Sequence, residues 1–233
     1  MDAKKSLPVQ LFVSMALLLL VSISASGVAN SQASSQTEQT ASQIDQDWET
    51  YWPDDDSDSI IDAINEGELN FLEKLPETPV HHHHNTFIIL ESSLETGWIK
   101  LQQCHENLDK LPRAQIVYNK ERIRHLRITR QKNIGQARVE NNTVQLTNVN
   151  SHARLCVEAE SRALIAQKDG TFVLQNGPFM RKFLDGYFPM QVTIDIRMPG
   201  NLSFIGIEPV EQKGFRVTRG KQSLHLDAWF EGR

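Results

Sequence analysis

The sequence predicts an all-β body, an antiparallel β-sandwich or barrel-like domain, preceded by a signal peptide and an acidic, partly helical or disordered arm. Three observations carry this prediction. Residues 1–29 combine a basic start, an apolar run and a small-residue end. Residues 30–80 are strongly acidic. From residue 81 to residue 233, short runs of alternating apolar and polar residues are separated by turn residues.

Composition sets the outer limits. The chain has 233 residues, of which 39% are hydrophobic and 23% are charged. These values are ordinary for a globular protein and exclude a multi-span membrane protein, a collagen-like chain and a wholly disordered chain.

The first segment has the three parts of a secretory signal peptide. Lys4 and Lys5 precede an apolar run from Leu11 to Ile23, and Gly27 and Ala29 occupy the −3 and −1 places of a cleavage site. The apolar run is shorter than the roughly 20 residues that span a membrane. We expect cleavage after Ala29, a periplasmic or extracellular location and no transmembrane span afterwards. The alternative is an uncleaved anchor.

Charge divides the remaining chain. Ser31–Val80 holds 13 acidic residues and one basic residue, whereas His81–Arg233 holds 15 acidic and 21 basic residues. Ser31–Gln46 reads as a flexible linker, and two short helices broken at Gly67 are expected after it. Either this acidic arm docks on the basic body, or it is a solvating tether.

Turn chemistry identifies the hairpins of the body. Asp169-Gly170 predicts a type I′ turn between Leu164–Ala166 and Phe172–Leu174. One segment is ambiguous, because a helical face also fits Trp98, Leu101, Cys104, Leu108 and Leu111. We interpret it as a strand through about Gln103, since it follows the Thr96-Gly97 turn. The other expected strands are 86–90, 115–118, 125–129, 136–140, 143–147, 155–160, 192–197, 202–207, 215–218 and 223–229.

The chain contains two cysteines, Cys104 and Cys156. An even number in an exported protein predicts a disulfide, and the loop-entropy model assigns it about 4 kcal/mol. Two free buried thiols are the alternative.

His81, His82, His83 and His84 form the most conspicuous run. Alternation along a strand would place His82 and His84 on one side and His81 and His83 on the other. Either pair could contribute to a zinc or copper site, which normally takes three or four protein ligands. Alternatively the run is solvated, or it is a pH-sensitive strand that attracts the acidic arm. The candidates for the missing ligands are His105, His125, His152, His225 and Glu91.

The segment Cys104-His105-Glu106-Asn107-Leu108-Asp109 resembles two motifs and completes neither. The first cysteine of a haem attachment site is missing, because position 101 is Leu, and Asp109 stands where a zinc protease has its second histidine. A bridging cysteine followed by a polar turn is the favoured interpretation.

A basic strip and an aromatic segment are the remaining candidate surfaces. The strip is favoured as a solvated strand face or a dock for the arm, with an anionic envelope lipid as the alternative partner. Nucleic acid is not an expected partner outside the cytoplasm. The segment 176–190 is favoured as a buried plug with one helical turn, with an exposed interaction patch as the alternative. The strip comprises Lys120, Arg122, Arg124, Arg127 and Arg130, and the aromatic segment Phe179, Met180, Phe183, Tyr187 and Phe188.

Function is constrained mainly by what the sequence lacks. It contains no G-x-S-x-G, phosphate-loop or dinucleotide-binding motif and no clear catalytic carboxylate pair. The sequence therefore favours an exported, non-enzymatic binding or assembly module of the cell envelope, whose partner is an envelope protein or an anionic envelope component. A metal-binding or metal-delivery protein and a metal-dependent envelope hydrolase are the alternatives.

Overall fold

The computed structural model describes residues 7–9, 17–20, 69–74, 76–177, 179–183, 186–187 and 189–232. All of them fall in one compact unit. Most of the predicted signal peptide and most of the predicted acidic arm lie outside the described residues, so both stay predictions. The short helix expected after Gly67 is wrong where the chain is described, because Leu69–Phe71 forms a strand that pairs with the sheet.

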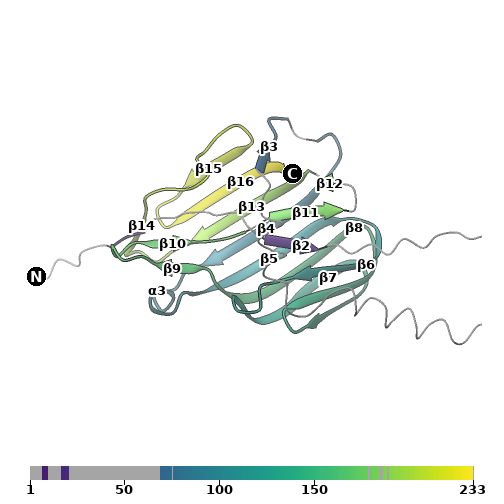
Figure 1. Ribbon diagram of the computed structural model, residues 1–233, viewed down its shortest axis with the longest axis horizontal. Coiled ribbons are helices and arrows are strands. Elements are labelled where there is room, and N and C mark those ends of the chain that lie inside the picture. The colour runs from purple at the N-terminus through teal and green to yellow at the C-terminus, as the bar shows by residue number, and fades with distance from the viewer. Residues whose placement is uncertain are drawn as a thin grey trace, which may run out of the picture. The chain divides into compact units, whose positions relative to one another are not determined.

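A nine-stranded sheet forms the body, and Figure 1 shows its long strands lying side by side. Seven strands follow one path, β3 (Leu69–Phe71) pairs with β16, and β7 (Ile123–Glu140) pairs with β8. The path runs through β15 (Phe215–Arg219), β16 (Ser223–Gly232), β13 (Met190–Arg197), β4 (His81–Ile88), β5 (Trp98–Leu108), β8 (Thr143–Arg162) and β6 (Leu111–Val117).

The predicted β-rich body is confirmed, but its antiparallel, sandwich or barrel-like form needs correction. The sheet is mixed, because β4 and β13 run parallel while the other neighbours on the path are antiparallel. A chain that forms β5 to β12 before it returns can approach β4 in either direction. Across the described strands, the path ends at β15 and β6, and the sheet is not closed into a barrel.

Local turn signals located the hairpins well. β9 (Leu164–Ala166) pairs with β10 (Phe172–Leu174), as predicted. The predicted type I′ turn is wrong, because that turn needs a positive φ at both central residues. Gly170 has φ 83°, whereas Asp169 is not among the positive-φ residues. Gly170 N–H donates to the Gln167 carbonyl at 3.1 Å. This is a turn followed by one left-handed glycine, which forms a slightly longer loop.

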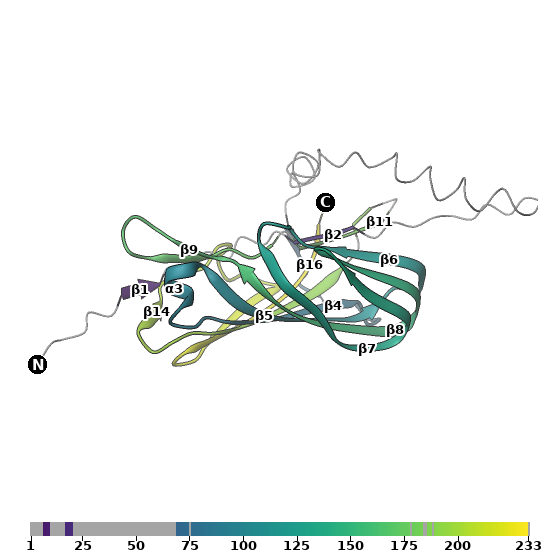
Figure 2. The same cartoon turned by 90° about the horizontal axis from the view of Figure 1, so that it is seen from below.

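The two longest strands bend back on themselves. β5 pairs with Ala153–Arg162 of β8, and β6 pairs with Thr143–Val149 of the same strand, so one edge of β8 has two successive partners. Non-glycine residues with positive φ occur at the bend, among them Asn133, Asn148 and His152. Left-handed residues within strands are typical of β-bulges, which bend a strand and strengthen its twist. Figure 2 shows the curvature of β6, β7 and β8. The predicted strands 125–129 and 136–140 are therefore parts of one strand.

Two apolar clusters fill the interior. The larger packs buried residues of β4, β13, β15 and β16, among them Phe87, Phe215 and Phe230. The smaller lies inside the bend and includes Val144, Leu146, Leu155 and Val157 from both halves of β8. Folding the ribbon over on itself therefore creates a second core.

The remaining elements are short. β1 (Leu7–Val9) pairs with β14 (Leu202–Phe204), β2 (Leu17–Leu20) pairs with β11 (Phe179–Phe183), β12 (Gly186–Tyr187) pairs with β11, and α3 spans Ser93–Thr96. Cleavage after Ala29 would remove β1 and β2, neither of which belongs to the nine-stranded sheet. No helix among the described residues is long and apolar enough to cross a membrane.

Candidate functional site

The histidine run is divided between the two faces of the sheet. His81 and His83 are buried, with 3% and 0% exposed, whereas His82 and His84 are half-buried. The alternation predicted from a strand is confirmed. The run therefore contributes to two different polar groups rather than to one four-ligand site.

The inner group is a buried histidine network of His81, His83, His105, Gln103 and Tyr118. His81 Nε2 lies 3.1 Å from His105 Nδ1, and His105 Nε2 lies 3.1 Å from Gln103 Oε1. The Tyr118 hydroxyl donates to the same Gln103 oxygen. Because a carbonyl oxygen only accepts, His105 carries its proton on Nε2 and accepts at Nδ1 from His81 Nε2. The contacts thereby assign both tautomers.

Burial keeps the network uncharged. The His83 ring stacks on the His105 ring with centroids 4.4 Å apart. Burial lowers the pKa of His105 to about 3, and burial together with the neighbouring His105 and His81 holds the pKa of His83 well below its usual range. Both effects disfavour the imidazolium form in a buried site. The network is therefore buried and uncharged and does not serve as an accessible site.

The outer group, which we name the histidine–aspartate cluster, lies on β4, β13 and β16. His84 Nε2 lies 2.7 Å from Asp195 Oδ2, and His225 Nδ1 lies 2.8 Å from Asp195 Oδ1. The strand register places Thr193 beside His84 and Asp195 beside His225. The complete cluster is His82, His84, Thr193, Asp195, His225 and Asp227.

These contacts assign the protons of the cluster. Asp195 accepts from both histidines, so His84 is protonated on Nε2 and His225 on Nδ1 when each is neutral. Thr193 Oγ1 donates to Asp227 Oδ1 at 3.0 Å, so it accepts from His82 Nε2 at 2.9 Å. Each of these three neutral histidines therefore keeps a lone pair on its other ring nitrogen.

Asp195 is the anionic centre of the cluster. Burial alone would raise the pKa of Asp195, but hydrogen bonds from His225 and His84 outweigh that effect and hold the pKa below its ordinary value. The side chains of His84, Asp195 and His225 are 39%, 35% and 50% exposed. The cluster is thus ordered by internal hydrogen bonds yet reachable from solvent.

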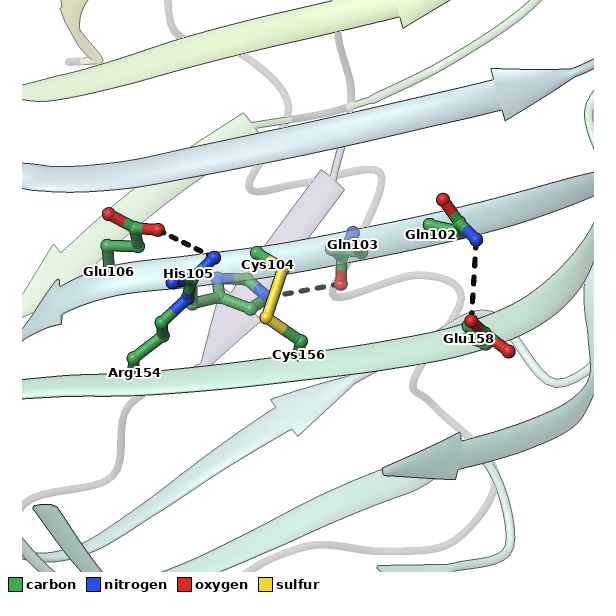
Figure 3. The surroundings of a disulfide bond; sticks show 8 residues. All are labelled: Gln102, Gln103, Cys104, His105, Glu106, Arg154, Cys156 and Glu158. Atoms are coloured by element: carbon green, nitrogen blue, oxygen red, sulfur yellow. Dashed lines mark hydrogen bonds and ion pairs between the residues drawn. A yellow bond between two sulfur atoms is a disulfide. The ribbon is translucent and has the colours of Figure 1, made fainter. Parts of the chain in front are cut away.

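The predicted disulfide joins neighbouring strands next to this cluster. Cys104 and Cys156 are directly paired between β5 and β8 and are bonded, with their Cα atoms 4.1 Å apart. Cys104 also lies opposite His84 on β4. Figure 3 shows the bridge between two other cross-strand contacts, a Gln102–Glu158 hydrogen bond of 3.4 Å and an Arg154–Glu106 ion pair of 3.1 Å.

Two of the five residues of the basic strip form ion pairs within the sheet. Arg124 pairs with Glu160 at 2.7 Å, and Arg127 pairs with Glu158. The Arg124 guanidinium also lies 4.1 Å from the centre of the Trp98 ring. Arg124 and Arg127 therefore already have partners, and the role of the whole strip stays a prediction. Docking of the acidic arm stays a prediction, since most of the arm lies outside the described residues.

Other expected metal ligands lie in different places. His105 joins the buried side and His225 the exposed side of the run, through the contacts above. His125 lies 3.5 Å from Glu160, and Glu91 accepts from Asn201 at 2.9 Å. Within the described part of the chain, no three His, Cys, Asp or Glu residues are arranged to hold a metal ion. Metal binding by His81–His84 therefore stays a prediction.

The aromatic segment differs from its predicted form in one respect. Phe179, Met180 and Phe183 belong to strand β11 rather than to a helical turn, because this segment pairs with β12 and β2. The side chains of this segment, including Tyr187, and all of Phe188 lie outside the described residues. Its assignment as core or surface stays a prediction.

Sequence reasoning missed Thr193, Asp195, Asp227, Gln103 and Tyr118 as members of polar groups. A local signal existed for three of them: Thr193, Asp195 and Asp227 occupy alternate positions in otherwise apolar strands. That pattern places them on the outer face, but it cannot name their partners. His84 and Asp195 are 111 residues apart in sequence.

The chain was also compared with known protein-family models, curated proteins and solved structures, and it matches none of them.

Proposed function

We propose that the chain is an exported, non-enzymatic binding or assembly module of the cell envelope, and that the histidine–aspartate cluster is the centre of its contact surface. One observation carries the proposal: Asp195 holds His84 and His225 in fixed orientations on an accessible face of a rigid sheet. Sites on strands hold polar groups more precisely than sites on loops. In the neutral form of each histidine the free ring nitrogen accepts a hydrogen bond, which suits donors such as amide, hydroxyl or ammonium groups.

The chemistry of the other residues favours binding over catalysis. Both cysteines are joined in the disulfide, which suits an oxidising compartment and leaves no thiol nucleophile. His105, the histidine of the weak protease-like motif, is fully buried. The most conspicuous polar side chains are therefore occupied in structural contacts, and the outer cluster is the group that a partner can reach.

Site-specific photocrosslinking in intact cells tests the contact surface. A crosslinking residue replaces exposed Gln102, beside the cluster, and a matched one replaces Lys168 in the β9–β10 loop. We expect one crosslinked envelope component from position 102, none from position 168, and loss of the product when His225→Ala is added. Equal products from both positions, or a product that survives His225→Ala, would contradict the proposed surface.

Export has its own test, so that the two parts can fail separately. The chain recovered from cell fractions is sequenced from its N-terminus and treated with a thiol-alkylating reagent. We expect an N-terminus at Asn30 and no alkylated cysteine before reduction. An intact N-terminus on a cytoplasmic protein would reject export, whatever the crosslinking result.

Metal binding is the second candidate function, and the carboxylate–histidine contacts favour it. Metal-binding histidines commonly donate their other ring N–H to a carboxylate, as His84 and His225 do here. Titration with Zn²⁺, Cu²⁺ and Ni²⁺ should compare the wild type with His84→Ala/His225→Ala, and use His125→Ala as the control. Stoichiometric submicromolar binding lost only in the double variant would support this function, while equal weak binding in all three proteins would remove it.

A further inference from the structure

A cavity of about 480 Å³ lies at the corner where α3 meets the ends of β8 and β9. This volume is in the range of small-molecule sites, which is about 300–1,000 Å³. No residue of the histidine–aspartate cluster lines it. Its lining includes Arg122, Arg162, Glu95, Leu164, Ile165 and Gln175.

Backbone hydrogen bonds fix the walls of this cavity. Leu164 N–H donates to the Gly97 carbonyl at 3.1 Å, and Arg162 N–H donates to the Arg122 carbonyl at 2.9 Å. Gly97 has φ 75°, and a Cβ atom there would lie 2.8 Å from the Leu164 carbonyl oxygen. The corner thus depends on a glycine that permits close approach of β9.

Two arginines face each other at this cavity. The hydrogen bond between their main chains places Arg122 and Arg162 side by side at the end of β7 and β8. Like charges that are cross-strand neighbours destabilise a sheet. Among the described residues neither arginine forms an ion pair, in contrast to Arg124 and Arg127 on the same ribbon. Glu95 lines the cavity but makes no ion pair with either arginine in this part of the chain.

The Arg122 side chain is held in place. Its Nε donates to the Arg162 carbonyl at 3.3 Å, and one terminal nitrogen donates to the Gln175 carbonyl at 3.4 Å. These contacts use two of the five guanidinium N–H donors. Burial lowers the pKa of Arg122, since the half-buried charge has lost part of its hydration. A positioned, partly desolvated cation without a carboxylate is suited to receive an anion.

The same cavity has an apolar side. Leu164 is 4% exposed and belongs to the larger core cluster, while neighbouring Ile165 is 41% exposed. Leu94 and Ala166 extend this lining. A ligand here would meet hydrocarbon on one side and guanidinium groups on the other.

We propose that this cavity binds an amphiphilic organic anion, with a carboxylate or phosphate head between Arg122 and Arg162 and a short alkyl group against Leu164 and Ile165. An anionic head would offset the repulsion between the two guanidinium groups. The alkyl group would remove exposed apolar surface from water. The proposal does not depend on the histidine–aspartate cluster or on export.

Calorimetric titration of the purified full chain, with its disulfide intact, tests the proposal. The probes are octanoate, octyl phosphate, octanol and inorganic phosphate. We expect one site for octanoate or octyl phosphate, and at least about tenfold weaker binding of octanol and of inorganic phosphate. Arg122→Gln and Arg162→Gln should each weaken binding of the anionic amphiphile about tenfold or more. Arg130→Gln, on β7 and outside the cavity lining, should leave the affinity unchanged.

Each of several results would overturn the proposal. Absence of binding by both anionic amphiphiles rejects the site, and equal affinity in Arg162→Gln and wild type rejects the role of the arginines. Octanol binding as tightly as octanoate rejects the anionic head, and inorganic phosphate binding as tightly as octyl phosphate rejects the apolar contact. If Arg122→Gln does not fold, Ile165→Glu replaces it: this exposed change adds a negative charge at the apolar side and should abolish binding.

Discussion

Acid should destabilise the protein well above the pH at which its carboxylates titrate, because of the buried histidine network. His105 has an ordinary pKa of 6.5 in the unfolded chain and a pKa of about 3 in the folded protein. Above about pH 6.5 His105 is largely neutral in both states, so its protonation does not lower the free energy of unfolding. As the pH falls, His105 binds a proton in the unfolded state but not in the folded state, so the free energy of unfolding decreases.

The size of the effect follows from the shift. One proton corresponds to about 1.4 kcal/mol per pH unit, so the free energy of unfolding should fall by about 3 kcal/mol between about pH 7.5 and about pH 4.5. His83, whose pKa is lowered in the same direction, adds to this loss. The pKa of Asp195 lies below its ordinary value of 3.8, so its contribution is lost only at lower pH. For a domain of typical stability, about 5–15 kcal/mol, the loss is large.

Urea unfolding of the disulfide-bonded protein at a series of pH values measures it. His105→Gln should reduce the slope of unfolding free energy against pH by about one proton, or about 1.4 kcal/mol per pH unit. His125→Gln, at a 74% exposed position outside the network, is the matched control. A wild-type stability that is flat down to about pH 4.5, or a His105→Gln slope equal to that of wild type, would refute the reasoning.

Three further changes have expected outcomes. Replacing Cys104 and Cys156 by Ser should lower the unfolding free energy by about 4 kcal/mol, because the bridge closes a loop with a sequence separation of 52 residues. Chemical denaturation measures this loss, and a value below about 1 kcal/mol would contradict the loop-entropy argument. Gly97→Ala should cost about 1–3 kcal/mol through backbone strain, whereas Gly206→Ala, with nothing within 4 Å of its Cβ position, should change little in the same thermal melts. Phe87→Ala should cost about 3–5 kcal/mol because Phe87 is only 1% exposed in the larger core, and a denaturation midpoint equal to that of wild type would count against that packing.

Local sequence patterns predicted much of the body. The pairing around Asp169-Gly170 follows from residues adjacent in sequence, and this hairpin is confirmed. The period of two in a strand also predicted that His81–His84 would divide between two faces. These features depend on backbone conformations that are determined by residues close together in the sequence.

Only the tertiary structure decided which residues meet. The parallel pairing of β4 with β13 brings His84 to Asp195, and β16 then adds His225 on the other side. The bend of the β7–β8 ribbon and the meeting of Arg122 with Arg162 likewise depend on register between distant segments. By itself the sequence determined a β-rich body, its hairpins and its cysteine pair. Strand order and register assembled the cluster and the cavity, because they are selected by packing of the whole sheet rather than by local propensity.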